Sequence, residues 1–263
     1  MYGYCDYFDN KKKTLPYATY EEEIEEYYKL LDMILESCLL YKGLGKDKKL
    51  FSRGLVITEA EMEQYYSLPP HTRKTDSCDV ELAASVEAAF SHIASRVKKT
   101  LDTEDKKASE EVRADMLWIE TLKRVFSLDR AGVLALILAL AYETDRRYAR
   151  VFGFLQDDIM KTRPTIGLLS TLIARSTEGE GWEDRLKRPL EEKVLKTLFL
   201  RGDEALNLDT ELVLSPFLLN LIMNAPTEED RMPEGLTLYT EEKGIPFFFA
   251  TNQKAMKLSM IPP

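Results

Sequence analysis

The sequence predicts a mainly α-helical protein, and two kinds of pattern support that prediction. Apolar side chains recur at three- and four-residue steps through most of the chain between residues 18 and 224, which places them along one face of a helix. Residues that favour the ends of helices stand at the boundaries of these stretches. Alternation typical of strands is short and comes late, in residues 197–208 and 236–250.

The first half of the chain contains several amphipathic stretches. One covers residues 18–41, and another covers residues 80–101 with Asp79 as its N-cap. Between them, residues 58–67 begin with the spacing of a capping box and predict a brief helix. A later helix carries Met116, Ile119, Leu122 and Val125 on one face. The stretches before residue 116 predict a helical N-terminal subdomain over residues 1–115.

Three helices in close succession are predicted in the centre of the chain. The uncharged run from Ala131 to Tyr142, with Asp129 as its cap, must be covered on most sides because it leaves no polar face. A second helix is expected over residues 145–155. After a turn, Thr165 caps a third helix over residues 166–174. Three short helices with a turn before the third are the layout of a helix-turn-helix domain.

Residues 197–208 alternate around a glycine-containing turn and predict a β-hairpin after a short helix at 189–196. A hairpin in this position would be the wing of a winged-helix domain, which we place at residues 116–225. Asp209 or Thr210 is expected to cap the last helix of that domain. Residues 226–263 are expected to be a linker, with a β-hairpin, that leads toward a C-terminal region.

Three motifs follow the apolar helix in order: Glu143-Thr-Asp-Arg-Arg-Tyr148, Phe154-Leu-Gln-Asp-Asp158 and Arg163-Pro-Thr165. This order resembles the N-terminal winged-helix region of a bacterial family of AAA+ ATPases, including those encoded beside contractile injection systems. The resemblance covers roughly residues 117–224, and Thr144 stands where that family has an apolar residue. The motif residues expected to be structural are Asp145, Tyr148, Asp157, Asp158, Pro164 and Thr165.

The resemblance implies a non-catalytic N-terminal region that acts as an interaction and positioning module for an ATP-driven remodelling enzyme. ATP, Mg²⁺ and oligomerisation would then belong to a C-terminal ATPase core. In this chain, residues 43–47 lack the spacing of a phosphate loop, so we expect no enzyme activity and no cofactor here. A stand-alone winged-helix adaptor and a DNA-binding transcriptional regulator are the alternatives.

Charge argues against nucleic acid as a partner. The chain has 36 basic and 45 acidic residues, a net charge of -9, and the third central helix offers only Ser170, Thr171 and Arg175 for contacts with bases. Protein partners are therefore expected. The candidate interaction surface comprises four arginines near the second and third central helices: Arg146, Arg147, Arg150 and Arg163. The roles of the first three stay open, and within the Arg163-Pro-Thr165 motif only Arg163 lacks a structural explanation.

The remaining composition predicts a cytoplasmic protein without a metal site. Three cysteines, far apart and with no CxxC pair, fit reduced thiols. His71 and His92 are the only histidines, and neither lies in a cluster of metal-ligand type. The first residues do not have the charge and apolar pattern of a signal peptide. The run from Ala131 to Tyr142 is too short to span a membrane.

Overall fold

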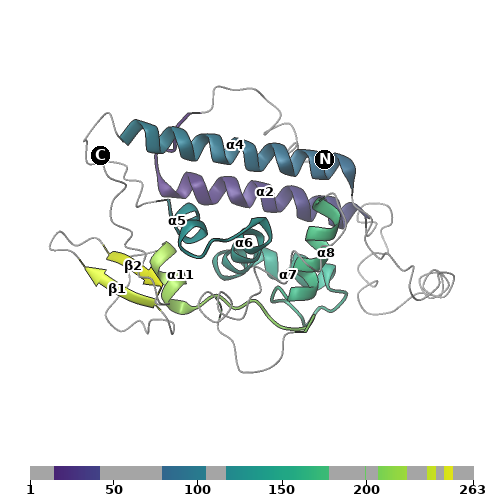
Figure 1. The fold of residues 1–263 in the computed structure, drawn as a ribbon. Helices are drawn as coiled ribbons and strands as arrows, with labels where there is room; N and C mark the ends of the chain where they lie inside the picture. The colour runs from purple at the N-terminus through teal and green to yellow at the C-terminus, as the bar shows by residue number, and fades with distance from the viewer. Residues whose placement is uncertain are drawn as a thin grey trace, which may run out of the picture.

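The computed structural model describes residues 15–41, 79–104, 117–177, 199, 207–223, 236–240 and 246–250. The helices predicted at 58–67 and 189–196 lie outside these residues. The described elements, drawn in Figure 1, are α2 (Tyr20–Tyr41), α4 (Val80–Glu104), α5 (Trp118–Val125), α6 (Arg130–Thr144), α7 (Arg147–Leu155), α8 (Ile166–Ser176), α11 (Pro216–Met223), β1 (Leu236–Thr240) and β2 (Pro246–Ala250). The described chain is therefore mainly helical, as predicted.

Helices α2 and α4 lie side by side and antiparallel, and α5 to α8 form a second layer against them (Figure 1). Polar contacts fix this arrangement at both ends of the pair. At one end Arg96 of α4 donates to Glu22 of α2. At the other end Ser37 of α2 donates to Asp79, whose carboxylate also caps α4 through the backbone N–H of Leu82. The predicted N-cap of α4 is thus confirmed.

Helix α6 is the centre of the core. All of its residues from Ala131 to Ala141 are buried, which confirms the prediction that this apolar helix is covered on most sides. Asp129 caps it by accepting a hydrogen bond of 2.9 Å from Gly132 N–H, as predicted. Within the described part of the chain, none of the helices is both long and apolar enough to cross a membrane.

Helix α7 begins at Arg147, two residues later than predicted. Asp145 lies before the helix because its carboxylate accepts a hydrogen bond from the backbone N–H of Arg147, a side-chain turn that competes with helix. The helix ends with Asp157 in the left-handed region, at φ 55°. The N–H of Asp158 then reaches the Gly153 carbonyl at 3.0 Å. The left-handed residue and this hydrogen bond together end the helix, reverse the direction of the chain and position the turn before α8.

The segment before α11 is extended, which corrects the predicted start of that helix. Glu211 pairs antiparallel with Thr165, and Leu214 pairs antiparallel with Phe199. Because Glu211 and Leu214 are engaged in these bridges, the chain is still extended there, and neither Asp209 nor Thr210 caps the helix. Ser215 does so instead, accepting from Leu218 N–H at 3.3 Å. Most of the predicted wing at 197–208 lies outside the described residues, so the wing stays a prediction.

One hydrophobic core joins the helices on both sides of the boundary predicted at residue 115. Buried side chains from Tyr17 in the first segment to Ile222 in α11 belong to the same cluster. Further along the chain, β1 and β2 form an antiparallel pair in which Leu236 lies opposite Ala250 and Thr240 opposite Pro246. This pair coincides with the hairpin predicted in residues 236–250.

Candidate interaction surface

The four arginines predicted as an interaction surface fall into two groups. Arg146 and Arg150 are exposed; Arg150 lies on α7, and Arg146 is the residue that immediately precedes this helix. Among the residues that the structure describes, neither has an ion pair. These two side chains are therefore available at the surface as a pair of positive charges.

Arg147 has a local structural role. Its Nε donates to Asp145 Oδ2 at 2.7 Å, and its backbone N–H donates to Asp145 Oδ1 at 2.9 Å. The hydrogen bond from the Arg147 side chain is the main reason that the pKa of Asp145 lies below its usual value. Both groups are at the surface, so the pair contributes little to stability but shapes the start of α7.

The structure shows a structural role for Arg163, for which the sequence alone suggested none. Its guanidinium lies over the ring of Tyr142, with Cζ 5.1 Å from the ring centroid. It also pairs with Glu143 at 3.5 Å and approaches Glu211 at 3.9 Å. Arg163 thus connects the turn before α8 to α6 and to the extended segment before α11.

The motif residues lie at joints between elements. The Tyr148 ring is buried, and its hydroxyl donates to Asp32 of α2 at 2.8 Å. The Thr165 hydroxyl caps α8 by accepting from Leu168 N–H and itself donates to Gln156 at 2.6 Å. Their contacts position helices rather than a reacting group.

Three motif residues lie in the turn between α7 and α8, and their contacts are also structural: Asp157, Asp158 and Pro164. The Pro164 carbonyl accepts from Leu212 N–H at 2.8 Å, which joins the turn to the extended segment before α11. The carboxylate of Asp158 accepts from Met160 N–H at 2.9 Å, and Asp157 supplies the left-handed residue after α7.

Two exposed apolar side chains beside the arginines were missed by the sequence analysis. Ile159 and Met160, in the turn after α7, are 57% and 83% exposed. The turn lies close to α7 at Gly153, where an added Cβ would be 3.2 Å from the Asp158 carbonyl oxygen and 3.5 Å from the Ile159 Cα. Gly153 is one turn along α7 from Arg150, so the turn that carries the apolar pair packs against the same helix as Arg150. We call Arg146, Arg150, Ile159 and Met160 the α7 surface.

Helix α8, the third helix of the predicted helix-turn-helix, faces inward. It packs against α2, α4 and α6, and none of its residues is exposed. Ser170 donates to the Ile166 carbonyl within the helix, and Arg175 is buried. The side chains that the sequence offered for base contacts are therefore largely engaged inside the protein.

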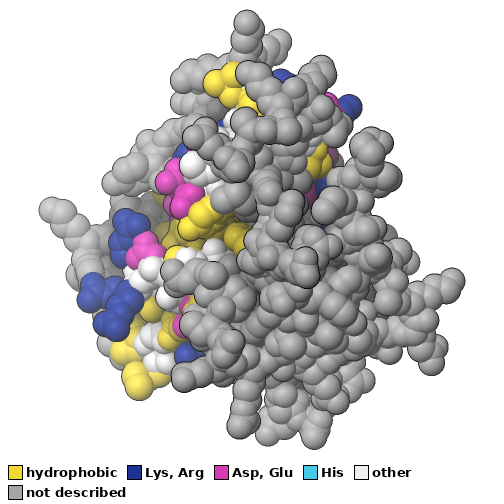
Figure 2. All heavy atoms as spheres, turned by 90° about the vertical axis from the view of Figure 1, so that its left-hand side faces the viewer, with side chains coloured by type: hydrophobic (Ala, Val, Ile, Leu, Met, Phe, Trp, Pro, Cys, Tyr) yellow, Lys and Arg dark blue, Asp and Glu magenta, His cyan; other side chains and the backbone are white. Residues whose placement is uncertain are grey.

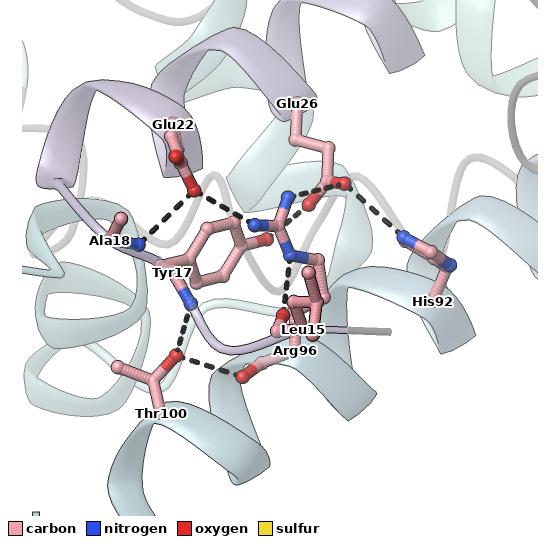
Figure 3. Close-up of polar contacts among 8 residues, drawn as sticks. All are labelled: Leu15, Tyr17, Ala18, Glu22, Glu26, His92, Arg96 and Thr100. Carbon is pink, nitrogen blue, oxygen red and sulfur yellow. Dashed lines mark hydrogen bonds and ion pairs between the residues drawn. The ribbon is translucent and has the colours of Figure 1, made fainter. Parts of the chain in front are cut away.

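A buried polar network that the sequence did not reveal joins α2, α4 and the segment before α2 (Figure 3). Glu26, 0% exposed, accepts from the Tyr17 hydroxyl and from Arg96 at 3.0 Å, and it lies 3.3 Å from His92 Nε2. The Arg96 guanidinium also lies 4.1 Å from the centroid of the Tyr17 ring. Because Arg96 further donates to the Leu15 carbonyl, the network holds the first described segment against the two helices.

Glu23 is a second fully buried carboxyl group. It accepts hydrogen bonds from Ile119 N–H at 3.2 Å and Glu120 N–H at 2.9 Å, so it caps α5 from a distant part of the chain. Burial raises the pKa of Glu23 to about 8, against these two hydrogen bonds, which lower it. The group is therefore largely protonated at neutral pH and serves as a structural cap.

Charges of both signs are mixed on the described surface. Figure 2 shows basic, acidic and hydrophobic side chains next to one another, with no continuous basic area in the coloured part of that face. In addition, the described residues contain no group of three or more His, Cys, Asp or Glu side chains that could hold a metal ion.

Comparison with known families places this helical domain in the class of modules that bind DNA or protein. Residues 9–231 match the family described as winged helix domain, variant, and the chain belongs to that family. The match extends across residue 115, in agreement with the single core. No curated protein and no solved structure matches the chain.

Proposed function

We propose that this chain is a protein-docking module that acts as the non-catalytic N-terminal region of an AAA+ ATPase and positions partner or client proteins for remodelling. The observation that carries the docking role is the α7 surface, where two exposed cations lie beside two exposed apolar side chains. The connection with an ATPase is supported by the motifs between Glu143 and Thr165, which resemble those of that family.

The α7 surface has the chemistry of a protein interface. Arginine and methionine are enriched in such interfaces, because each combines a large contact area with an adaptable side chain. Arg146 and Arg150 would attract carboxylates, while Ile159 and Met160 would bury apolar area. The expected partner surface is therefore acidic at its rim and apolar at its centre.

Winged-helix domains as a class bind DNA or protein, and the buried α8 favours protein for this chain. A helix that reads bases must present donors and acceptors in the major groove, whereas α8 has no exposed residue. The net charge of -9 also opposes the approach of a polyanion.

A charge-reversal experiment tests the docking role. The chain carrying R146E and R150E is compared with the wild type and with a control carrying K98E and K99E, which makes the same change in charge on α4. Binding to proteins of the source cells is measured after mild cross-linking. We expect a partner captured by the wild type and the control to be lost at least tenfold with the α7 variant. Equal capture by all three proteins would contradict the role of this surface.

Two further measurements separate the alternatives. Anisotropy with a random DNA duplex at low salt should show no binding, and salt-dependent binding that needs Arg146 and Arg150 would replace the proposal with a DNA-binding function. An immunoblot of the native protein should show a band well above the 30.3 kDa of this chain. A band at that mass would support the stand-alone adaptor instead.

A further inference from the structure

A pocket of about 400 Å³ opens where α2, α7, α8 and the segment before α11 meet. This volume lies in the range of sites that bind small molecules. Its lining is mixed: Cys38 and Tyr41 come from α2, Leu155 from α7, and Leu168, Thr171 and Arg175 from α8. The pocket is distinct from the α7 surface, because none of the four residues of that surface lines it.

Arg175 is the polar group in the pocket that requires an explanation. It is only 5% exposed, and its guanidinium Cζ lies 4.0 Å from the centroid of the Tyr41 ring. One nitrogen, Nη2, lies 3.4 Å from Asp79 Oδ2, an oxygen that also accepts from Ser37 at 3.2 Å. The remaining contacts of Asp79 cap α4, so this carboxylate is shared among several donors.

The Nε atom of Arg175 has no hydrogen-bond partner among the described residues, although it is fully buried. Unpaired buried donors are rare in folded proteins, and those on charged groups are especially costly. Arg175 lines the pocket, so a turn of its side chain toward an occupant would give the buried Nε the acceptor that it lacks.

The rest of the lining limits what that occupant can be. Leu155, Leu168 and Leu208 offer apolar surface. Lys161 pairs with Asp209 at 2.7 Å, so these two opposite charges largely compensate each other. Asp157 adds a further negative charge to the lining. A ligand with several negative charges would be repelled, whereas a single carboxylate could reach Arg175 and leave an apolar tail against the leucines.

We propose that this pocket binds a small monocarboxylate with an apolar tail, whose carboxylate accepts a hydrogen bond from Arg175 Nε. Arg175 selects the carboxylate, the leucines select the tail, and the acidic side chains disfavour polyanions. This binding site does not depend on the docking role of the α7 surface.

Thermal unfolding of the full chain with sodium hexanoate tests the proposal, at ionic strength matched with sodium chloride. Two compounds serve as controls. Hexanol has the apolar tail but no charge, and inorganic phosphate has negative charge but no tail. At a hexanoate concentration ten times Kd, the unfolding midpoint should rise by about 3–5 °C. No rise up to tens of millimolar, or an equal rise with hexanol or phosphate, would overturn the proposal.

Three variants locate the effect. R175M should abolish the rise, because it removes the donor and keeps a side chain of similar length. K98M removes an equal charge from the exposed face of α4 and should keep the full rise. If R175M does not fold, the T171L variant provides the test, because the larger side chain fills part of the pocket and leaves Arg175 in place. T171L should reduce the rise in the unfolding midpoint by more than half. An unchanged rise in the folded pocket variants would overturn the assignment.

Discussion

The hydroxyl of Tyr148 on α7 donates a hydrogen bond of 2.8 Å to the carboxylate of Asp32 on α2. The two residues are 116 positions apart, so this contact joins the central motif region to the first long helix. The Tyr148 ring also packs against Phe152 and Tyr28, with centroids 5.8 and 6.1 Å away. A residue that the sequence marks as part of a local motif therefore holds two distant segments together.

Replacing Tyr148 with Phe tests this contact, because the ring stays and only the hydroxyl is removed. We expect Y148F to lower the free energy of unfolding by about 1–2 kcal/mol, the usual effect of losing a hydrogen bond to a charged group. Urea denaturation measures the change. Y142F is the matched control, since the Tyr142 hydroxyl lies 3.5 Å from Thr162 and should contribute little. If both variants lost the same free energy of unfolding, the hydrogen bond to Asp32 would contribute no more to stability than the long contact of Tyr142.

The buried cap Glu23 should make stability depend on pH. Its pKa is raised from 4.5 to about 8 in the folded protein, so between these values the native state binds more protons than the unfolded state. Stability from this group is fully present below pH 4.5, decreases as the pH rises to about 8, and changes no further once Glu23 is ionised in both states. Denaturation of wild type and E23Q from pH 5 to 9 should show a decrease of a few kcal/mol that is absent in E23Q. Parallel pH profiles would mean that Glu23 is already ionised.

Ser127 follows α5 with a φ of 51°, a left-handed conformation that is unfavourable for residues with a side chain. The N–H of Ser127 reaches the Arg124 carbonyl at 3.3 Å, and the next residue completes the helix ending. We expect S127G to stabilise the protein by about 0.5–1 kcal/mol. S95G, in the middle of α4, should destabilise it by about 1 kcal/mol. A loss of stability in S127G would show that this serine contributes a contact beyond its backbone.

The division of the arginines into structural and exposed groups can be measured directly. R163M should reduce the free energy of unfolding by about 0.5–1.5 kcal/mol, because the contacts with Tyr142 and Glu143 are lost. R150M removes an exposed cation and should change stability by less than about 0.5 kcal/mol. Chemical denaturation compares the two proteins. The opposite order would assign the structural role to Arg150.

Local patterns in the sequence were enough to predict most of the helices. The apolar run of α6 has no polar face, so it had to be buried wherever it folded. Asp129, Asp79 and Thr165 were recognised as caps because capping depends on backbone groups only two or three residues away. The predicted start of α11 was wrong, because local spacing does not show that Glu211 pairs with Thr165 and Leu214 with Phe199.

The surface and the interior differ in what the sequence could predict about them. Four arginines were proposed as a surface from their number and proximity, but whether each is exposed depends on neighbours elsewhere in the chain. Tyr142, which lies against Arg163, is 21 residues earlier. The apolar pair Ile159 and Met160 was missed because periodicity does not show which side of a turn faces outward.

By itself, the sequence determined the helical class, the caps of α4, α6 and α8, and the buried centre, because these follow from interactions within a few residues. Only the tertiary structure decided that Glu26 is held by Arg96, that Glu23 caps α5 and that α8 faces inward. The pocket around Arg175 is a result of the same kind, since α2, α7, α8 and the segment before α11 together form it. Such contacts join segments that are far apart in the chain, and their partners are selected by packing, which local spacing does not encode.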